Sequence, residues 1–192
     1  MKITPADRRT RVAGLCAALL LTAGAAAGSA AAAPDALRPG PAREAAALTG
    51  SGKLHRPAGD DLAFSFDAHL AAKDNADPNR ATGTFRFSHY KGNWGGSADV
   101  KVDCLMTGGP VAVVTGIVTR GDGVMAEAEG RRVGVTVHDD GGHDRLGYSW
   151  AAVNDPTAFE LPPCTSGAPF ETAEPGAGDF RVLPWFPSGR AG

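Results

Sequence analysis

Acidic side chains crowd one short segment of the chain, Asp139–Asp144. Besides Asp139, Asp140 and Asp144, the segment holds two glycines and His143. Carboxylate oxygens on a turn are the ligands that calcium prefers, while a nearby histidine could serve a transition metal instead. The same composition is typical of a turn between two strands, because Asp accepts backbone N–H groups and Gly adopts positive φ angles. We interpret the segment as a structural turn, with a calcium site on these carboxylates as the alternative, and we expect no cofactor.

Aromatic and polar side chains meet at a second place in the chain. His89 and Tyr90 precede the glycine-rich turn 91–96, which contains Trp94. Exposed aromatic rings beside polar groups can stack on a sugar ring or hold a small apolar ligand. The alternative is that Trp94 folds back to cover the end of the hydrophobic core. We predict a ligand-binding site at His89, Tyr90 and Trp94.

Two patterns that could serve catalysis lack the parts that catalysis needs. The segment Gly147–Ala151 is one residue short of a nucleophile elbow, which needs a following helix, and Pro156 leaves no room for one. Asp67 and His69 share a strand face, but nothing identifies a partner or a substrate pocket. The sequence therefore favours a non-enzymatic binding protein. The alternative is a small hydrolase or metal-dependent enzyme with a site built from loops. A buried cluster of titratable side chains would reverse the order of these two hypotheses.

The elements that must position these residues are strands. Apolar and polar residues alternate with the period of a β-strand in several segments. In the segment 98–106 this alternation places Cys104 and Met106 on the apolar face. We predict strands over 62–68, 84–88, 98–106, 111–119, 133–137, 146–150 and 180–182.

The strand predicted over 111–119 differs from the others because it is apolar on both faces. A strand that is solvated on one side shows polar residues on that side. We therefore expect a terminal segment of the chain to cover its outer face.

Short strands at hairpin spacing, frequent glycines and the lack of a helical pattern predict an all-β fold. We predict a small antiparallel β-barrel, because closure removes exposed strand edges; a β-sandwich is the alternative. Beyond Ala152 the alternation fades into a Pro-rich C-terminal segment, with prolines at Pro156, Pro162, Pro163, Pro169 and Pro175.

The start of the chain predicts export. Basic residues precede the apolar run 12–27, and small residues follow it, which is typical of a signal peptide cleaved after Ala32. We expect a signal peptide over 1–32, a flexible leader over 33–47, one domain over 48–187 and a disordered C-terminus over 188–192. The protein is then secreted, by the general or the twin-arginine route, and no other stretch is long enough for a membrane span.

Two cysteines remain once the signal peptide and its Cys16 are removed. They are Cys104 and Cys164, and an oxidising compartment favours a bond between them. This disulfide would tie the Pro-rich segment to the domain and stabilise the fold by about 4 kcal/mol in the chain-entropy model.

The charge of the chain argues against nucleic acid as a partner. Its formal net charge is −2, and the signal peptide carries mostly basic residues, so the mature protein is more acidic still. Phosphate-binding surfaces need clustered Lys and Arg. We expect an extracellular ligand or protein as the partner, and the sequence leaves the oligomeric state open.

Three blocks of the chain carry a resemblance to a known family. They are 84–89, 102–116 with its Cys-Leu-Met-Thr-Gly-Gly core, and 137–150. In these blocks the chain resembles the secreted actinobacterial proteins labelled repetin-like. The resemblance implies an exported β-rich domain whose activity is not established, and it carries over no catalytic residues.

Overall fold

The computed structural model describes residues 43–153, 155–158, 160–176 and 179–187. The expected signal peptide, most of the expected leader and the expected disordered C-terminus lie outside these residues. The helices of the described part are three short 3₁₀ turns: η1 (Ala72–Asp74), η2 (Pro78–Arg80) and η3 (Gly123–Ala128). No helix in this part is long and apolar enough to cross a membrane.

The described strands form one antiparallel sheet in the order β8-β7-β6-β5-β4-β3-β2-β1-β9. The chain meanders from β1 to β8, and β9 then returns to pair with β1. The strands are β1 (Glu44–Lys53), β2 (Asp61–Ala71), β3 (Thr82–Lys91), β4 (Trp94–Gly108), β5 (Val111–Gly121), β6 (Arg132–His138), β7 (Arg145–Tyr148), β8 (Glu171–Thr172) and β9 (Asp179–Leu183). The all-β prediction is confirmed.

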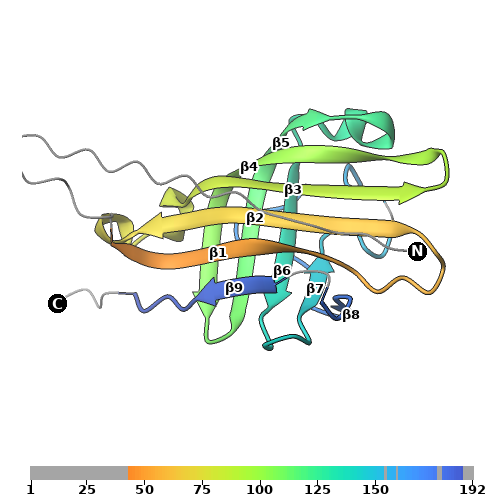
Figure 1. Ribbon diagram of the computed structural model, residues 1–192. Coiled ribbons are helices and arrows are strands. Elements are labelled where there is room, and N and C mark those ends of the chain that lie inside the picture. The colour runs from red at the N-terminus through yellow and green to blue at the C-terminus, as the bar shows by residue number, and fades with distance from the viewer. Residues whose placement is uncertain (1–42, 154, 159, 177–178, 188–192) are drawn as a thin grey trace, which may run out of the picture. The chain divides into compact units, whose positions relative to one another are not determined.

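The sheet curls over on itself into a half-barrel, so that β1 and β2 lie across the front of β5 and β6 (Figure 1). The continuation of β1 meets the edge strand β8, where Leu54 forms a bridge with Ala173 and the His55 N–H donates to the Thr172 carbonyl over 2.8 Å. The β-sandwich alternative is wrong, because the described strands belong to a single sheet.

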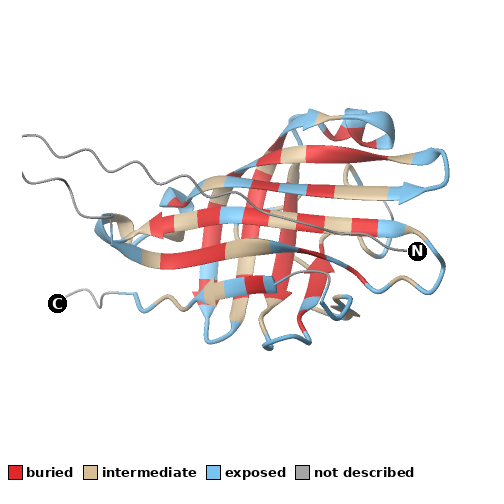
Figure 2. Cartoon of the chain, in the orientation of Figure 1, coloured by how far each residue is buried: buried red, intermediate tan, exposed pale blue. Residues whose placement is uncertain are grey.

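The inner face of the half-barrel holds an aromatic core. Alternation along β2 and β3 brings the predicted phenylalanines to this face, and the buried positions follow one another across neighbouring strands in Figure 2. Ring centroids lie 4.5 to 6.5 Å apart, which is the range of favourable aromatic pairs. The rings belong to Phe64, Phe66, Phe85, Phe87, Tyr148, Trp150 and Phe180.

The first strand begins at Glu44, before the predicted domain start at Leu48. Ala46, Ala47 and Leu48 are all buried, since β1 lies inside the sheet between β2 and β9. Consecutive buried residues produce no alternation, so the period-two pattern could not reveal this half of the strand. The residues from Glu44 to Ala47 therefore belong to the domain and not to a leader.

The prediction that Cys104 and Met106 lie on the core face of β4 is wrong. The pairing of β4 with β5 shifts register between Val102 and Cys104, and such a bulge moves every later side chain to the opposite face. Cys104 pairs beside Thr115 on the outer face, Leu105 takes the core position, and Met106 is 41 % exposed.

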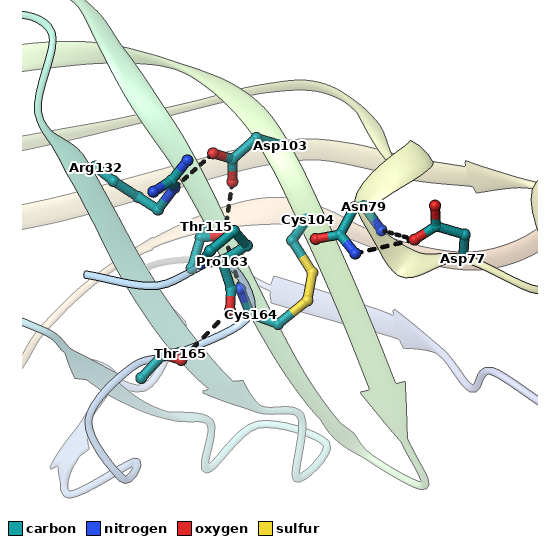
Figure 3. The surroundings of a disulfide bond; sticks show 9 residues. All are labelled: Asp77, Asn79, Asp103, Cys104, Thr115, Arg132, Pro163, Cys164 and Thr165. Atoms are coloured by element: carbon teal, nitrogen blue, oxygen red, sulfur yellow. Dashed lines mark hydrogen bonds and ion pairs between the residues drawn. A yellow bond between two sulfur atoms is a disulfide. The ribbon is translucent and has the colours of Figure 1, made fainter. Parts of the chain in front are cut away.

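The predicted disulfide between Cys104 and Cys164 is confirmed, and it lies on this outer face. Figure 3 shows the hydrogen bonds that hold the tail beside it. The Thr115 hydroxyl accepts from the Cys164 N–H over 3.1 Å and donates to Asp103 over 2.7 Å. Arg132 Nε donates to the other oxygen of Asp103 over 2.6 Å. The covalent bond thus acts together with a polar cluster.

The C-terminal segment 160–170 covers the outer face of β5, β6 and β7, as the two-sided apolar pattern of β5 predicts. Two glycines let the backbones approach. A Cβ at Gly134 would lie 2.2 Å from the carbonyl oxygen of Thr165, and one at Gly147 would lie 1.9 Å from that of Ala168. Any side chain there would push the tail off the sheet.

Candidate functional site

A pocket opens at one end of the half-barrel, beside the hairpin that joins β3 to β4. It has a volume of about 200 Å³. We call it the mouth pocket; its lining residues are His89, Trp94, Val124, Met125, Glu127, Trp150, Asp155 and Pro156. Two of the three predicted ligand-binding residues, His89 and Trp94, therefore meet in one cavity.

The register of the sheet explains why His89 and Trp94 point into the same space. His89 pairs opposite Leu62 on one side and Gly96 on the other. Residues directly opposite, and residues two apart along a strand, share a face of the sheet. Because Leu62 is a buried core residue, His89 and Trp94 both lie on the inner face of the half-barrel.

The two tryptophans of the mouth pocket have different environments. Trp150 is 3 % exposed and packs on Phe87 with ring centroids 4.5 Å apart. Trp94 is 51 % exposed, and among the described aromatic rings it contacts that of His89, nearly perpendicular to it and with centroids 5.5 Å apart. Trp150 is thus the floor that separates the pocket from the core. Trp94 is a rim residue with an open face, which does not fit the alternative that it covers the core.

A chain of hydrogen-bonded side chains runs from His89 across the mouth. His89 Nε2 lies 2.7 Å from Asp60 Oδ2, and Arg56 Nη2 lies 2.9 Å from the same oxygen. Arg56 also pairs with Glu171, and the Tyr148 hydroxyl donates to Glu171 over 2.6 Å. The Asp60 side chain is 5 % exposed. These contacts fix the position of the His89 ring from behind.

The protonation of Asp60 and Tyr148 determines which atoms donate the hydrogen bonds that link His89 to Tyr148. The hydrogen bond from Arg56, with a further one from His89, lowers the pKa of Asp60 to about 2. Asp60 is therefore ionised and can only accept, so His89 Nε2 carries the proton that it shares with Asp60. In the neutral ring the lone pair then lies on Nδ1. At the other end, burial and then the bond to Glu171 raise the pKa of Tyr148, which keeps its hydroxyl protonated.

Two carboxylates complete the pocket. Asp155 Oδ1 accepts from the Thr157 N–H over 2.8 Å and from the Thr157 hydroxyl over 2.7 Å, and these bonds lower the pKa of Asp155. Within the described part of the chain, Glu127 has no hydrogen-bond or ion-pair partner and Asp155 has no basic side chain within ion-pair distance. The charge of Arg131 also favours the ionised form of Asp155, so Glu127 is the carboxylate of the pocket that has no basic neighbour in the described part of the chain.

Tyr90, the third predicted residue, lies elsewhere. It follows His89 on β3 and so projects to the outer face, where its hydroxyl donates to Asp122 over 3.4 Å. Cys164 is also distant, because Cys104 lies ten residues along β4 from Trp94, or about 30 Å at the rise of a strand. Of the C-terminal segment, Asp155 and Pro156 reach the pocket and the disulfide does not.

The acidic segment Asp139–Asp144 lies beside β9, and its carboxylates bond the backbone of that strand. Asp144 is 4 % exposed and accepts from the N–H groups of Asp140 and Phe180, over 2.9 and 3.1 Å. Asp139 accepts from the Val182 N–H over 3.1 Å. These carboxylates satisfy edge N–H groups of β9 that no further strand pairs. Across the described residues, no three His, Cys, Asp or Glu side chains are grouped to hold a metal ion.

The other two sequence patterns lie away from the mouth pocket. The Ser149 hydroxyl accepts from the Gly134 N–H over 3.2 Å, at the end of β7. On the outer face of β2, His69 lies between Asp67 at 2.8 Å and Glu44 at 2.7 Å. Although partial burial opposes it, these two carboxylates raise the pKa of His69.

Comparison of the chain with protein-family models, with curated proteins and with solved structures finds no match. The resemblance to repetin-like proteins therefore stays a prediction.

Sequence reasoning missed the residues that support His89. Arg56 and Asp60 lie in the β1–β2 connection, and Glu171 comes 115 residues after Arg56 in a segment without alternation. Tyr148 sits in the apolar alternation of the strand predicted over 146–150, which gives no sign of its bond to Glu171. The one local signal was the Arg-Asp spacing of four residues, which is common on surfaces.

Proposed function

We propose that this protein is a secreted, non-enzymatic binding protein that holds a small molecule, or one unit of a glycan, in the mouth pocket. The observation that carries the proposal is the half-exposed ring of Trp94 on the inner side of the sheet, beside a histidine held by a part-buried chain of polar contacts. Binding sites of small ligands commonly combine a concave aromatic wall with a few placed polar groups.

The construction of the pocket supports binding rather than core packing. Trp150 already closes the core, so Trp94 is not needed for that purpose. The ion-pair chain from His89 to Tyr148 holds one wall rigid, which lowers the conformational entropy that binding would cost. A volume of about 200 Å³ suits a small ligand or a single sugar ring better than a protein surface.

The test is a ligand-observed NMR screen of sugars, amino acids and small amines against the mature protein and two variants. Trp94→Ala removes the rim of the pocket. Tyr90→Ala is the matched control, because Tyr90 is an exposed aromatic residue of the same hairpin on the opposite face. We expect hits that Trp94→Ala abolishes and Tyr90→Ala retains. Hits that survive in Trp94→Ala, or no hits at all, would contradict the proposal.

The buried Asp60–His89 pair favours a second candidate, a hydrolase in which His89 acts as general base on water. An oriented imidazole with a carboxylate behind it is suited to that role. We place it second because the described lining residues of the mouth pocket include no Lys, Arg, Asn, Gln, Ser or Thr side chain that could stabilise an oxyanion formed by the attack of water. Mass spectrometry of each hit after long incubation separates the candidates. A product formed by the natural chain and not by His89→Asn would establish the enzyme, and unchanged hits would support binding alone.

A further inference from the structure

We propose that the ligand of the mouth pocket is an organic cation, a molecule that carries an ammonium group. This inference rests on the proposed function and adds the chemical class of the ligand. Three features of the pocket lead to it: its carboxylates, the orientation of His89 and the open face of Trp94.

The charged lining of the pocket is negative. Glu127 and Asp155 contribute carboxylates, and no Lys or Arg lines the cavity. Elsewhere on the described surface, acidic side chains commonly have a basic neighbour, as Asp99 has Arg86 at 2.7 Å and Asp61 has Lys53 at 2.6 Å. A ligand with a positive charge would supply the counter-charge that Glu127 lacks among the described residues and that Asp155 receives only from Arg131, which does not line the pocket.

His89 adds an acceptor to the same wall. Its Nε2 is engaged by ionised Asp60, so the ring turns Nδ1 away from that pair, and Nδ1 has no partner among the described residues. With Glu127 and Asp155, the pocket offers three acceptor groups when the His89 ring is neutral. The side-chain N–H donors among its described lining residues are the two indoles and His89 Nε2, which is already engaged by Asp60. An ammonium group, which donates and does not accept, matches this inventory better than a sugar hydroxyl, which does both.

Trp94 supplies the third feature. Indole has the strongest attraction for cations among aromatic side chains, and the attraction grows when water is excluded. Trp94 lines the same cavity as both carboxylates, so one ammonium group could contact the ring and the acids together.

The test titrates the mature protein with choline and with 3,3-dimethyl-1-butanol, a neutral alcohol of the same shape. The signal is the indole N–H resonance of Trp94, assigned by its loss in Trp94→Ala. We expect choline to shift this resonance saturably and the alcohol to bind at least tenfold more weakly. Glu127→Gln should weaken choline binding several-fold. Glu160→Gln removes an exposed carboxylate outside the pocket and should leave it unchanged.

The outcomes separate the inference from the proposed function. Equal affinity for choline and the alcohol, or a Trp94 shift produced by sugars and not by choline, would overturn the cation inference and leave the binding site in place. Choline binding that Glu127→Gln and Glu160→Gln weaken alike would assign the effect to net charge and also overturn the inference. A Trp94 resonance that responds to no compound of the screen would overturn the proposed function itself.

Discussion

Carboxylates gather both at the Asp139–Asp144 segment, which we call the seam, and in the mouth pocket, and the two places differ in what the carboxylates face. At the seam, Asp139 and Asp144 accept backbone N–H groups from β9. In the mouth pocket, Glu127 has no partner in the described part of the chain, and Asp155 keeps one oxygen free of hydrogen bonds. The first place completes the sheet, and the second leaves charge available to a ligand.

The comparison shows that residue type and spacing alone did not identify the candidate site. The seam has the denser acidic sequence, with an Asp-Asp-Gly-Gly-His-Asp run, and the mouth pocket draws its acids from two connections that lie 28 residues apart. What separates them is the supply of unpaired backbone donors. The backbone N–H groups of an edge strand have no neighbouring strand to bond, so nearby carboxylates accept from them, because a buried N–H without a hydrogen bond is costly.

The largest effect should come from the floor of the mouth pocket. Trp150→Ala removes a buried ring that packs on Phe87, Phe64 and Tyr148, and we expect the free energy of unfolding to fall by about 3–5 kcal/mol. Urea denaturation measures it. A loss below about 1 kcal/mol would show that the floor is not part of the core.

The seam should give the next largest effect. Asp144→Ala leaves the N–H groups of Asp140 and Phe180 without their acceptor, and we expect a loss of about 2–3 kcal/mol of unfolding free energy. Asp140→Ala, at the exposed neighbouring carboxylate, is the control and should cost less than about 0.5 kcal/mol. Equal losses in the two variants would refute the structural role of Asp144.

Acid should reduce the contribution that Asp60, the hydrogen-bond partner of His89, makes to the free energy of unfolding. The pKa of Asp60 lies near 2, below its ordinary value of 3.8, so the ionised form stabilises the fold above pH 4 and this contribution is lost as the pH falls towards 2. In Asp60→Asn the contribution is absent at every pH. The difference in unfolding free energy between the natural chain and Asp60→Asn should therefore narrow between about pH 5 and pH 2. A difference that stays constant or widens over this range would contradict the assignment; Asp61→Asn is the surface control.

The sequence could predict features that follow from the alternation of apolar and polar residues. It could predict little of the strand register or of the contacts between distant residues. The strands β2 to β7, the cover over β5 and the Cys104–Cys164 bond followed from apolar periodicity and cysteine number. The bulge after Val102 did not, since one inserted residue leaves no compositional trace. Arg56 and Glu171 meet only through the fold, so no local pattern could place them behind His89.

Calcium should have almost no effect, because the seam carboxylates already have backbone partners. A ligand that binds only the native state at a hundred times its dissociation constant stabilises it by about 2.7 kcal/mol, which would raise Tm by several degrees in a domain of this size. We expect millimolar calcium to move Tm by less than about one degree. A rise of several degrees that Asp140→Ala and Asp144→Ala abolish would establish the alternative of a calcium site on Asp139, Asp140 and Asp144.

The most direct test of the difference between floor and rim is the unfolding free energy of Trp94→Ala, measured by urea denaturation beside Trp150→Ala. Trp94 is a rim residue with a half-exposed ring, so we expect a loss of about 1 kcal/mol or less, together with loss of ligand binding at the mouth pocket. A loss of about 3 kcal/mol or more would show that Trp94 is a core residue, and the binding role assigned to it would be wrong.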